Sequence, residues 1–203
     1  MLGGLIGSIV LLQAPFAFAA GDRPVRSLLE TRHDRVVVQE WDLSCGAAAL
    51  ATLLNHQLGD GVSEREIARG LIQREEYIKD PNFLRFRQGF SLLDLKRYVD
   101  QRGYQGIGLG KLTLSDLQEH APIMVPVDFK GYKHFVIFRG IGGNRVLVAD
   151  PAFGNRTMSI SAFEDAWLDH PKLGRVGFSV ARADGIRLPN RLAPKDSDFV
   201  TLR

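Results

Sequence analysis

Between residues 45 and 102 the chain carries hydrophobic residues at helical spacing. Residues 45–58 are rich in Ala and Leu and predict a buried helix that ends at Gly59. Residues 63–73 open with a Ser-x-x-Glu capping pattern and carry apolar residues four apart, which predicts a second helix. Residues 91–102 repeat that pattern and predict a third.

After residue 104 the pattern changes to short runs of β-branched and aromatic residues separated by Gly, Asn and Pro. These runs predict four strands, at residues 123–129, 133–141, 145–150 and 175–181. A brief helix is expected at 161–168. Helices followed by antiparallel strands indicate an α+β fold in one domain, with N-terminal helices packed on a C-terminal antiparallel sheet.

The two ends of the chain differ from this body. Residues 1–20 carry no Asp, Glu, Lys or Arg and finish in small residues that signal peptidase accepts, which predicts a signal peptide over residues 1–19. An uncleaved membrane anchor and a wrongly assigned start are the alternatives. We expect an exported protein in which residues 20–183 form the domain and residues 184–203 form a polar tail that wraps the surface or frays.

Composition narrows the class of protein. Of the 203 residues, 45% are hydrophobic and 24% are charged, which excludes wholesale disorder and collagen-like or coiled-coil architectures. The 26 basic and 23 acidic residues give a net charge of +3, too small and scattered for a nucleic-acid footprint. A single cysteine excludes an internal disulfide and a multi-thiolate zinc site, and no other metal-ligand spacing occurs, so we expect no metal and no cofactor.

That single cysteine, Cys45, stands at the predicted start of the first helix and precedes Gly46. Unpaired backbone N–H groups and the positive end of the helix dipole both favour the thiolate at such a position. The glycine leaves room for another chain to approach. The alternative is a buried structural cysteine, because most free cysteines are of that kind.

A histidine and an aspartate flank the Gly-Gly-Asn turn between the second and third predicted strands. If the hairpin is symmetric about Gly142, His134 and Asp150 lie directly opposite each other on one face, with Cβ atoms about 5 Å apart. A slip of one residue would send the two side chains to opposite faces. An imidazole beside a carboxylate is held ready to act as a base, whereas the alternative is an inconsequential surface ion pair.

Gln39 stands six residues before Cys45, after an apolar run. A side-chain amide that enters the loop before a nucleophile can donate to a developing oxyanion, together with the Cys45 backbone N–H. Trp41 lies between these two residues and is expected to form a wall of the cleft or part of the core.

These residues together resemble a known family. The motif Gln-x5-Cys-Gly that begins at Gln39, the His-Phe-Val strand that begins at His134 and the Asp-Pro pair at Asp150 resemble the C39 peptidases. Those are papain-like cysteine proteases best known for removing double-glycine leader peptides from bacteriocins, and the resemblance covers roughly residues 36–170. It implies a papain-like fold in which Cys45 is the nucleophile and His134 the general base and acid. Asp150 would then orient His134, and Gln39 would line the oxyanion hole.

Two features depart from that family. Ser44 stands immediately before the cysteine, where the family usually has an acidic or amide residue, and this bears on fine specificity more than on activity. The bacteriocin-type domain is normally cytosolic and fused to an ABC transporter, whereas this chain carries an apparent export signal and no transporter segments. The combination resembles the stand-alone, exported C39-like proteins associated with secretion of functional amyloid.

The expected function is that of a periplasmic cysteine endopeptidase that cuts after small residues such as Gly-Gly. Its expected partner is a polypeptide substrate, with amyloid or export-system proteins as candidates, and we expect neither nucleic-acid binding nor an integral membrane domain once the signal is removed. Two alternatives stay open. One is a non-catalytic peptide-binding or chaperone module with a papain-like cleft, and the other is a cell-wall peptide amidase.

Overall fold

The computed structural model of this protein describes residues 26–73, 75–80 and 89–202. The expected signal peptide at residues 1–19 lies outside these ranges. Within them, the helices before the sheet are α1 (Leu28–Arg32), α2 (Cys45–Thr52), α3 (Glu64–Ile72), α4 (Glu75–Lys79) and α6 (Leu92–Gln101).

The three long helices that the sequence predicts are confirmed. Helix α2 continues into a π-helical segment, Leu53–Leu58, which ends at Gly59 with a left-handed φ of +80°. Helices α3 and α6 begin after Ser63 and Ser91, whose hydroxyls accept hydrogen bonds from backbone N–H groups three residues ahead.

The second half of the chain forms a six-stranded antiparallel sheet in the order β1-β8-β2-β3-β4-β5. Its strands are β1 (Tyr104–Leu109), β2 (Ile123–Phe129), β3 (Tyr132–Gly142), β4 (Arg145–Asp150), β5 (Gly154–Ser159) and β8 (Gly177–Arg182). The remaining elements are α7 (Leu114–His120), α8 (Ile160–Ala166), the short pair β6 (Asp169–His170) and β7 (Gly174–Arg175), and α9 (Asp196–Thr201). The sequence did not predict β1, α7 or β5.

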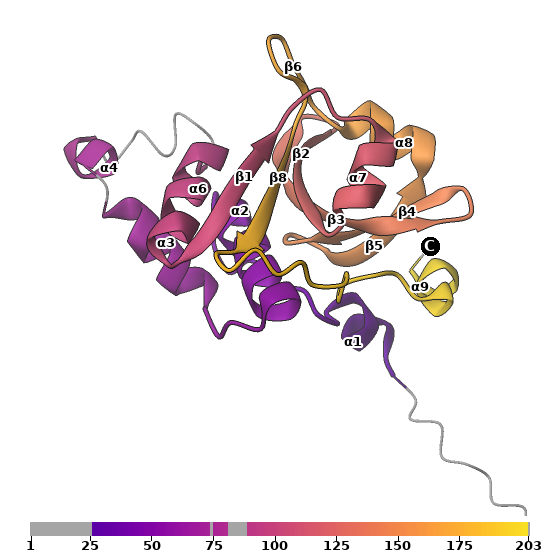
Figure 1. Ribbon diagram of the computed structural model, residues 1–203. Coiled ribbons are helices and arrows are strands. Elements are labelled where there is room, and N and C mark those ends of the chain that lie inside the picture. The colour runs from indigo at the N-terminus through magenta and orange to yellow at the C-terminus, as the bar shows by residue number, and fades with distance from the viewer. Residues whose placement is uncertain (1–25, 74, 81–88, 203) are drawn as a thin grey trace, which may run out of the picture.

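Both faces of the sheet are covered, which makes the fold the expected α+β arrangement. Figure 1 shows α2, α3 and α6 on one side of the sheet and α7 and α8 on the other. Alternate residues of β3 enter different cores: Ile137 packs among the first group of helices, whereas Val136 and Phe138 pack beneath α7 and α8. Burial on both faces explains why residues 135–138 of this strand are apolar without interruption.

The pairing of β3 with β4 differs from the predicted hairpin. Gly142 pairs with Arg145, and the register then shifts by one residue between Phe138 and Gly140, so that Ile137 faces Ala149. The expected direct pairing of His134 with Asp150 is therefore wrong. Continued to the end of β4, the register sets Asp150 beside position 136, two residues from His134 and on the same face. Without the bulge the two side chains would leave the sheet on opposite faces.

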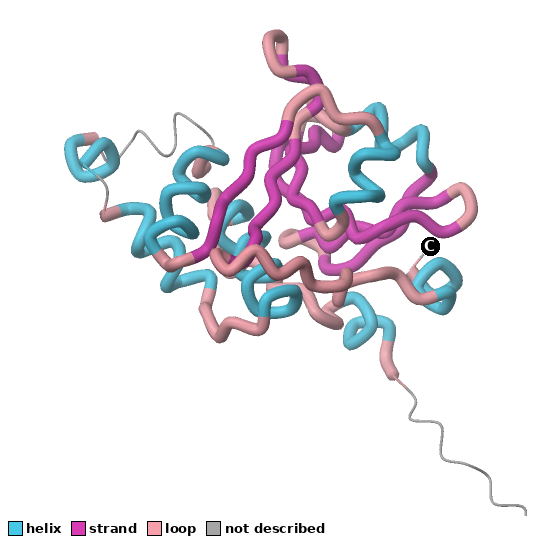
Figure 2. Tube along the Cα trace, in the orientation of Figure 1, coloured by secondary structure: helices cyan, strands magenta, loops and turns pink. Residues whose placement is uncertain are grey.

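Part of the C-terminal segment, residues 190–194, packs against this bulge. The tail runs as an extended loop past the sheet to α9 (Figure 2), and Leu192 and Leu202 are buried. Pro194 packs on Gly140, where an added Cβ would lie 2.9 Å from the proline Cδ. Gly140 has a φ of +151°, so this bulge position favours glycine for both steric and backbone reasons.

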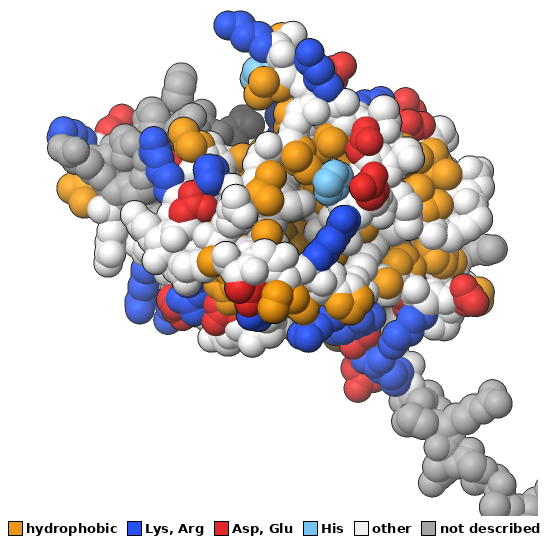
Figure 3. Space-filling view, in the orientation of Figure 1, with side chains coloured by type: hydrophobic (Ala, Val, Ile, Leu, Met, Phe, Trp, Pro, Cys, Tyr) orange, Lys and Arg blue, Asp and Glu red, His pale blue; other side chains and the backbone are white. Residues whose placement is uncertain are grey.

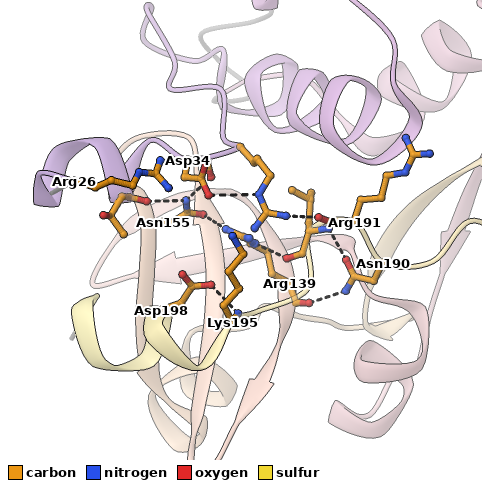
Figure 4. A network of polar contacts seen from close by, with 11 residues as sticks. Arg26, Asp34, Arg139, Asn155, Asn190, Arg191, Lys195 and Asp198 are labelled. Atoms are coloured by element: carbon orange, nitrogen blue, oxygen red, sulfur yellow. Dashed lines mark hydrogen bonds and ion pairs between the residues drawn. The ribbon is translucent and has the colours of Figure 1, made fainter. Parts of the chain in front are cut away.

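Arg139, the extra residue of the bulge, ties the tail to the body (Figure 4). Its side chain is buried, and it donates hydrogen bonds to the Leu192 carbonyl and to the Asn155 side chain, each at 2.6 Å. Asn190 of the tail donates to the Arg139 carbonyl at 2.9 Å. Burial lowers the pKa of Arg139 to about 10, which leaves the guanidinium charged at neutral pH.

Replacing Leu192 by Ala tests this role of the tail. Because Leu192 is fully buried, we expect Leu192→Ala to lower the free energy of unfolding by about 2–5 kcal/mol in chemical denaturation. Val200→Ala is the matched control in the same tail, because Val200 is 73% exposed. This substitution should change the free energy of unfolding by less than about 0.5 kcal/mol. Equal effects of the two substitutions would show that the tail does not contribute to the core.

Candidate active site

Cys45 is the first residue of α2 and is only 7% exposed. It lies at a cleft of about 340 Å³ that His134 and Phe135 of β3 also line. The rest of the lining is mainly apolar and consists of Gly89, Phe90, Ser91, Leu92, Pro126, Lys133 and Leu168. The candidate nucleophile and the candidate base, 89 residues apart in the sequence, therefore share one cleft.

His134 and Asp150 form a buried pair. The imidazole Nε2 lies 3.1 Å from the Asp150 Oδ1, and the two side chains are 1% and 0% exposed. The same carboxylate oxygen accepts the Ala152 backbone N–H at 2.9 Å, which fixes its orientation. With Nε2–H donating to the carboxylate, the basic nitrogen of the neutral ring is Nδ1, which lies 3.3 Å from the Tyr132 carbonyl oxygen.

The backbone of Gln39 is hydrogen-bonded to the turn that follows Asp150. Its N–H donates to the Pro151 carbonyl at 2.8 Å, which holds the segment before Cys45 against the turn that follows Asp150. Its side-chain Nε2 donates to the Trp41 carbonyl at 3.0 Å, and a further side-chain hydrogen bond joins Gln39 to Tyr132. Trp41 itself is 39% exposed, so it belongs to the surface of this loop and not to the core.

The protonation of Cys45 differs from the expectation. Burial raises the pKa of the Cys45 thiol, and hydrogen bonds from the backbone N–H groups of Phe135 and Gly46 oppose this rise without cancelling it. The predicted preference for thiolate at the helix start is therefore wrong for the protein at rest. A thiol that keeps its proton needs a base beside it in order to react.

Two aromatic rings flank the imidazole, and the sequence analysis missed both. The Tyr132 ring lies 4.5 Å from the His134 ring between centroids, and the Phe129 ring lies 5.4 Å away. Tyr132 is nevertheless 44% exposed, so it forms an outer wall over the histidine. Its position two residues before His134 on one face of β3 was the available signal.

Glu64 is a third residue that the sequence did not single out, and it provides a hydrogen-bond acceptor for Ser44. The Glu64 side chain, in the first turn of α3, is buried and accepts the Glu40 backbone N–H at 2.9 Å. The Ser44 hydroxyl also donates to Glu64. A carboxylate from another helix thus anchors the loop before Cys45, at the place where the family usually has a polar residue of its own. Nothing in the sequence distinguishes this glutamate from an ordinary residue of a helix start.

Comparison with known proteins shows the family of the chain. The model of the peptidase C39 family matches residues 33–170. The chain belongs to the peptidase C39 family. The probable functional amyloid proteases FapD of Pseudomonas aeruginosa and Pseudomonas fluorescens are 36% and 37% identical to it over 146 and 147 residues, which is 71% of this chain. The match spans 62% of each of those relatives, less than two thirds of their length.

Solved C39 domains share the fold. A double glycine motif protease from an AMS/PCAT transporter, solved in complex with the leader peptide, is 19% identical, with a TM-score of 0.57 over 72% of this chain and 90% of that one. The peptidase domain of Streptococcus ComA, a bifunctional ABC transporter, is 20% identical, with a TM-score of 0.57 over 74% and 99%. The expected papain-like C39 fold is thereby confirmed.

Within the described ranges, His, Cys, Asp and Glu side chains form no group of three that could hold a metal ion. No helix in the same part of the chain is long and apolar enough to cross a membrane. On the face in Figure 3, basic and acidic side chains are interspersed.

The raised pKa of Cys45 predicts how the thiol responds to alkylation. Since a raised pKa leaves less thiolate at pH 7 than an unfolded cysteine has, iodoacetamide should react more slowly with the native protein than with the denatured one. The native rate should rise most steeply above about pH 8.5. Intact mass spectrometry of quenched samples measures both rates. A native rate that is already at its plateau below pH 7 would contradict the protonated resting thiol.

Proposed function

We propose that this protein is a periplasmic cysteine endopeptidase in which Cys45, His134, Asp150 and Gln39 carry the reaction. The observation that carries the proposal is the buried contact of His134 Nε2 with Asp150, 3.1 Å long, at a cleft that also contains Cys45. The pair is buried and is therefore not a surface ion pair, and Cys45 lies at the same cleft as the histidine. Membership of a peptidase family supports the same reaction.

The first half of the reaction is acylation. His134 Nδ1 takes the proton of the Cys45 thiol while the sulfur attacks the scissile carbonyl carbon and forms a C–S bond. The carbonyl oxygen becomes an oxyanion, which the side-chain amide N–H of Gln39 and the Cys45 backbone N–H stabilise. The imidazolium, whose second N–H still donates to Asp150, then protonates the leaving nitrogen, and the C–N bond breaks.

Deacylation repeats these steps with water as the nucleophile. His134 removes a proton from water as the water oxygen attacks the thioester carbon, and the C–S bond then breaks. The proton returns to the sulfur, so that thiol and neutral imidazole are restored. The Tyr132 carbonyl, 3.3 Å from Nδ1, accepts a hydrogen bond from the imidazolium and stabilises it between the two halves.

The proposed cleavage site follows small residues such as Gly-Gly. Support comes from the solved relative that is described as a double glycine motif protease and was crystallised with its leader peptide. Phe90, Leu92 and Phe135 narrow the cleft beside Cys45 with bulky apolar walls, which favours a chain that has no side chains at the scissile bond.

We further propose that the substrate belongs to a functional amyloid export system. The two FapD relatives are described as probable functional amyloid proteases, and the uncharged segment at residues 1–20 has the composition of an export signal. The physiological substrate would then be a secreted or secretion-associated polypeptide in the same compartment.

Substitution of the nucleophile and the base tests the reaction. With a fluorogenic peptide that contains Gly-Gly, Cys45→Ala should abolish cleavage, and His134→Ala should reduce kcat by roughly 10²- to 10⁴-fold. His170→Ala is the matched control, because His170 is exposed on β6 and should leave the rate unchanged. Cleavage by Cys45→Ala at the wild-type rate would refute the proposal. Equal peptide binding by both proteins with no cleavage would identify a binding module instead.

The oxyanion role of Gln39 makes a separate prediction. Gln39→Ala should lower kcat by roughly 10²- to 10³-fold and leave KM nearly constant, because the lost donor acts mainly in the transition state. Gln105→Ala, at an exposed position of β1, serves as the control. An effect of Gln39→Ala confined to KM would show that this residue contacts substrate and does not stabilise the oxyanion.

A further inference from the structure

The proposed reaction does not explain how the negative charge of Asp150 is stabilised in the interior of the protein. Its carboxylate is fully buried, and one oxygen, Oδ1, carries the bonds to His134 and to the Ala152 N–H. The other oxygen, Oδ2, is buried and accepts no hydrogen bond within the described residues. Burying a carboxylate whose oxygen accepts no hydrogen bond costs free energy unless a positive charge lies close to it.

Arg156 supplies that charge from the neighbouring strand. Its Nη1 lies 3.5 Å from Oδ2 of Asp150, and its side chain is 32% exposed. Arg156 belongs to β5, which pairs with β4, and it stands directly opposite Val148, two residues before Asp150. The pairing therefore places the arginine on the same face of the sheet as the carboxylate.

Aromatic rings hold the guanidinium at this point. Its central carbon lies 4.3 Å from the centroid of Phe129 and 5.5 Å from that of Phe153. Phe129 is also the ring that lies 5.4 Å from His134, so one side chain contacts both the arginine and the histidine. Stacking on two rings limits the freedom of a long side chain that would otherwise move in solvent.

We propose that Arg156 is a positioning residue for the His134–Asp150 pair. Held by Phe129 and Phe153, it compensates the charge of Asp150 and keeps Oδ1 of the carboxylate turned toward Nε2 of His134. The inference rests on the proposed peptidase function and adds to it a residue that touches neither the substrate nor Cys45.

The sign of the expected pH effect follows from the charges around the pair. Those from the packed elements are Cys45 on α2, Tyr132 and Lys133 on β3, Asp128 on β2, Lys130 in the turn after β2, Asp165 on α8 and Arg156 on β5, with Asp42 in the loop before α2. Removing the Arg156 cation leaves Asp150 uncompensated and removes a repulsion on the imidazolium. Each effect makes proton uptake by the pair easier, so both move the acidic limb of the rate profile to higher pH.

The chain offers a matched control in Arg175. This arginine is 33% exposed, lies 5.3 Å from the Trp167 ring centroid and pairs with Glu164 at 3.4 Å. Arg156→Met and Arg175→Met therefore remove a stacked, ion-paired cation of similar exposure, one beside Asp150 and one elsewhere. We expect Arg156→Met to reduce kcat roughly 10- to 100-fold and Arg175→Met to leave it unchanged.

The decisive readouts are the pH profile of kcat/KM and the imidazole titration of His134, followed by NMR. In Arg156→Met both should move upward by about half a unit to one unit, and Arg156→Lys should restore the profile while recovering only part of kcat. Equal profiles for Arg156→Met and Arg175→Met would overturn the inference and leave the peptidase proposal standing. If wild type cleaves no faster than Cys45→Ala, the peptidase proposal fails, and the His134 titration still decides whether Arg156 acts on the pair.

Discussion

The one-residue bulge at Arg139 determines whether His134 and Asp150 can meet. Pairing between β3 and β4 begins at the turn in one register and continues beyond the bulge in another, and only the second register sets the two side chains on the same face. Everything proposed for the chemistry depends on that shift, because the contact at 3.1 Å requires it. The same bulge also carries the buried guanidinium of Arg139 and the close approach of Pro194 to Gly140.

The C-terminal tail therefore has a part in the site, although it lies away from the cleft. Its Leu192 carbonyl accepts a hydrogen bond from Arg139, and its Pro194 packs on Gly140 at the bulge. At the other end of β4, Asp150 is held by backbone N–H donation from Ala152 and by the nearby cation of Arg156. The two buried charged groups on this hairpin are thus held differently: Asp150 has a cation nearby, whereas Arg139 has hydrogen bonds to neutral oxygens and a pKa that burial lowers.

Much of this arrangement could be predicted from local sequence patterns. The helices after Cys45, Ser63 and Ser91 carry strong capping and stop signals, and the strands from 123 to 150 are apolar with clear turns. Strand β1 was missed because Gly106 and Gly108 weaken its pattern, and β5 because Gly154, Asn155 and Arg156 read as polar turn residues.

The site was predictable in its residues but not in its geometry. Cys45, His134 and Asp150 were identified from type and spacing, yet the bulge that brings the last two together leaves no local signal beyond a glycine. The protonation of Cys45 was mispredicted because helix-dipole reasoning omits desolvation, which depends on how the folded chain buries the thiol. Glu64, Tyr132 and Arg156 act through contacts between elements, which no single segment of sequence contains.

The central claim is that His134 activates Cys45 toward a carbonyl in the cleft. A peptide that ends in Gly-Gly vinyl sulfone tests it most directly, because addition needs both an activated sulfur and a proton donor. Intact mass spectrometry and peptide mapping should show one probe on Cys45 of the wild-type protein, with the rate falling at least 10²-fold in His134→Ala. Equal labelling of wild type and His134→Ala, or a wild-type protein that binds the peptide and stays unmodified, would contradict the account.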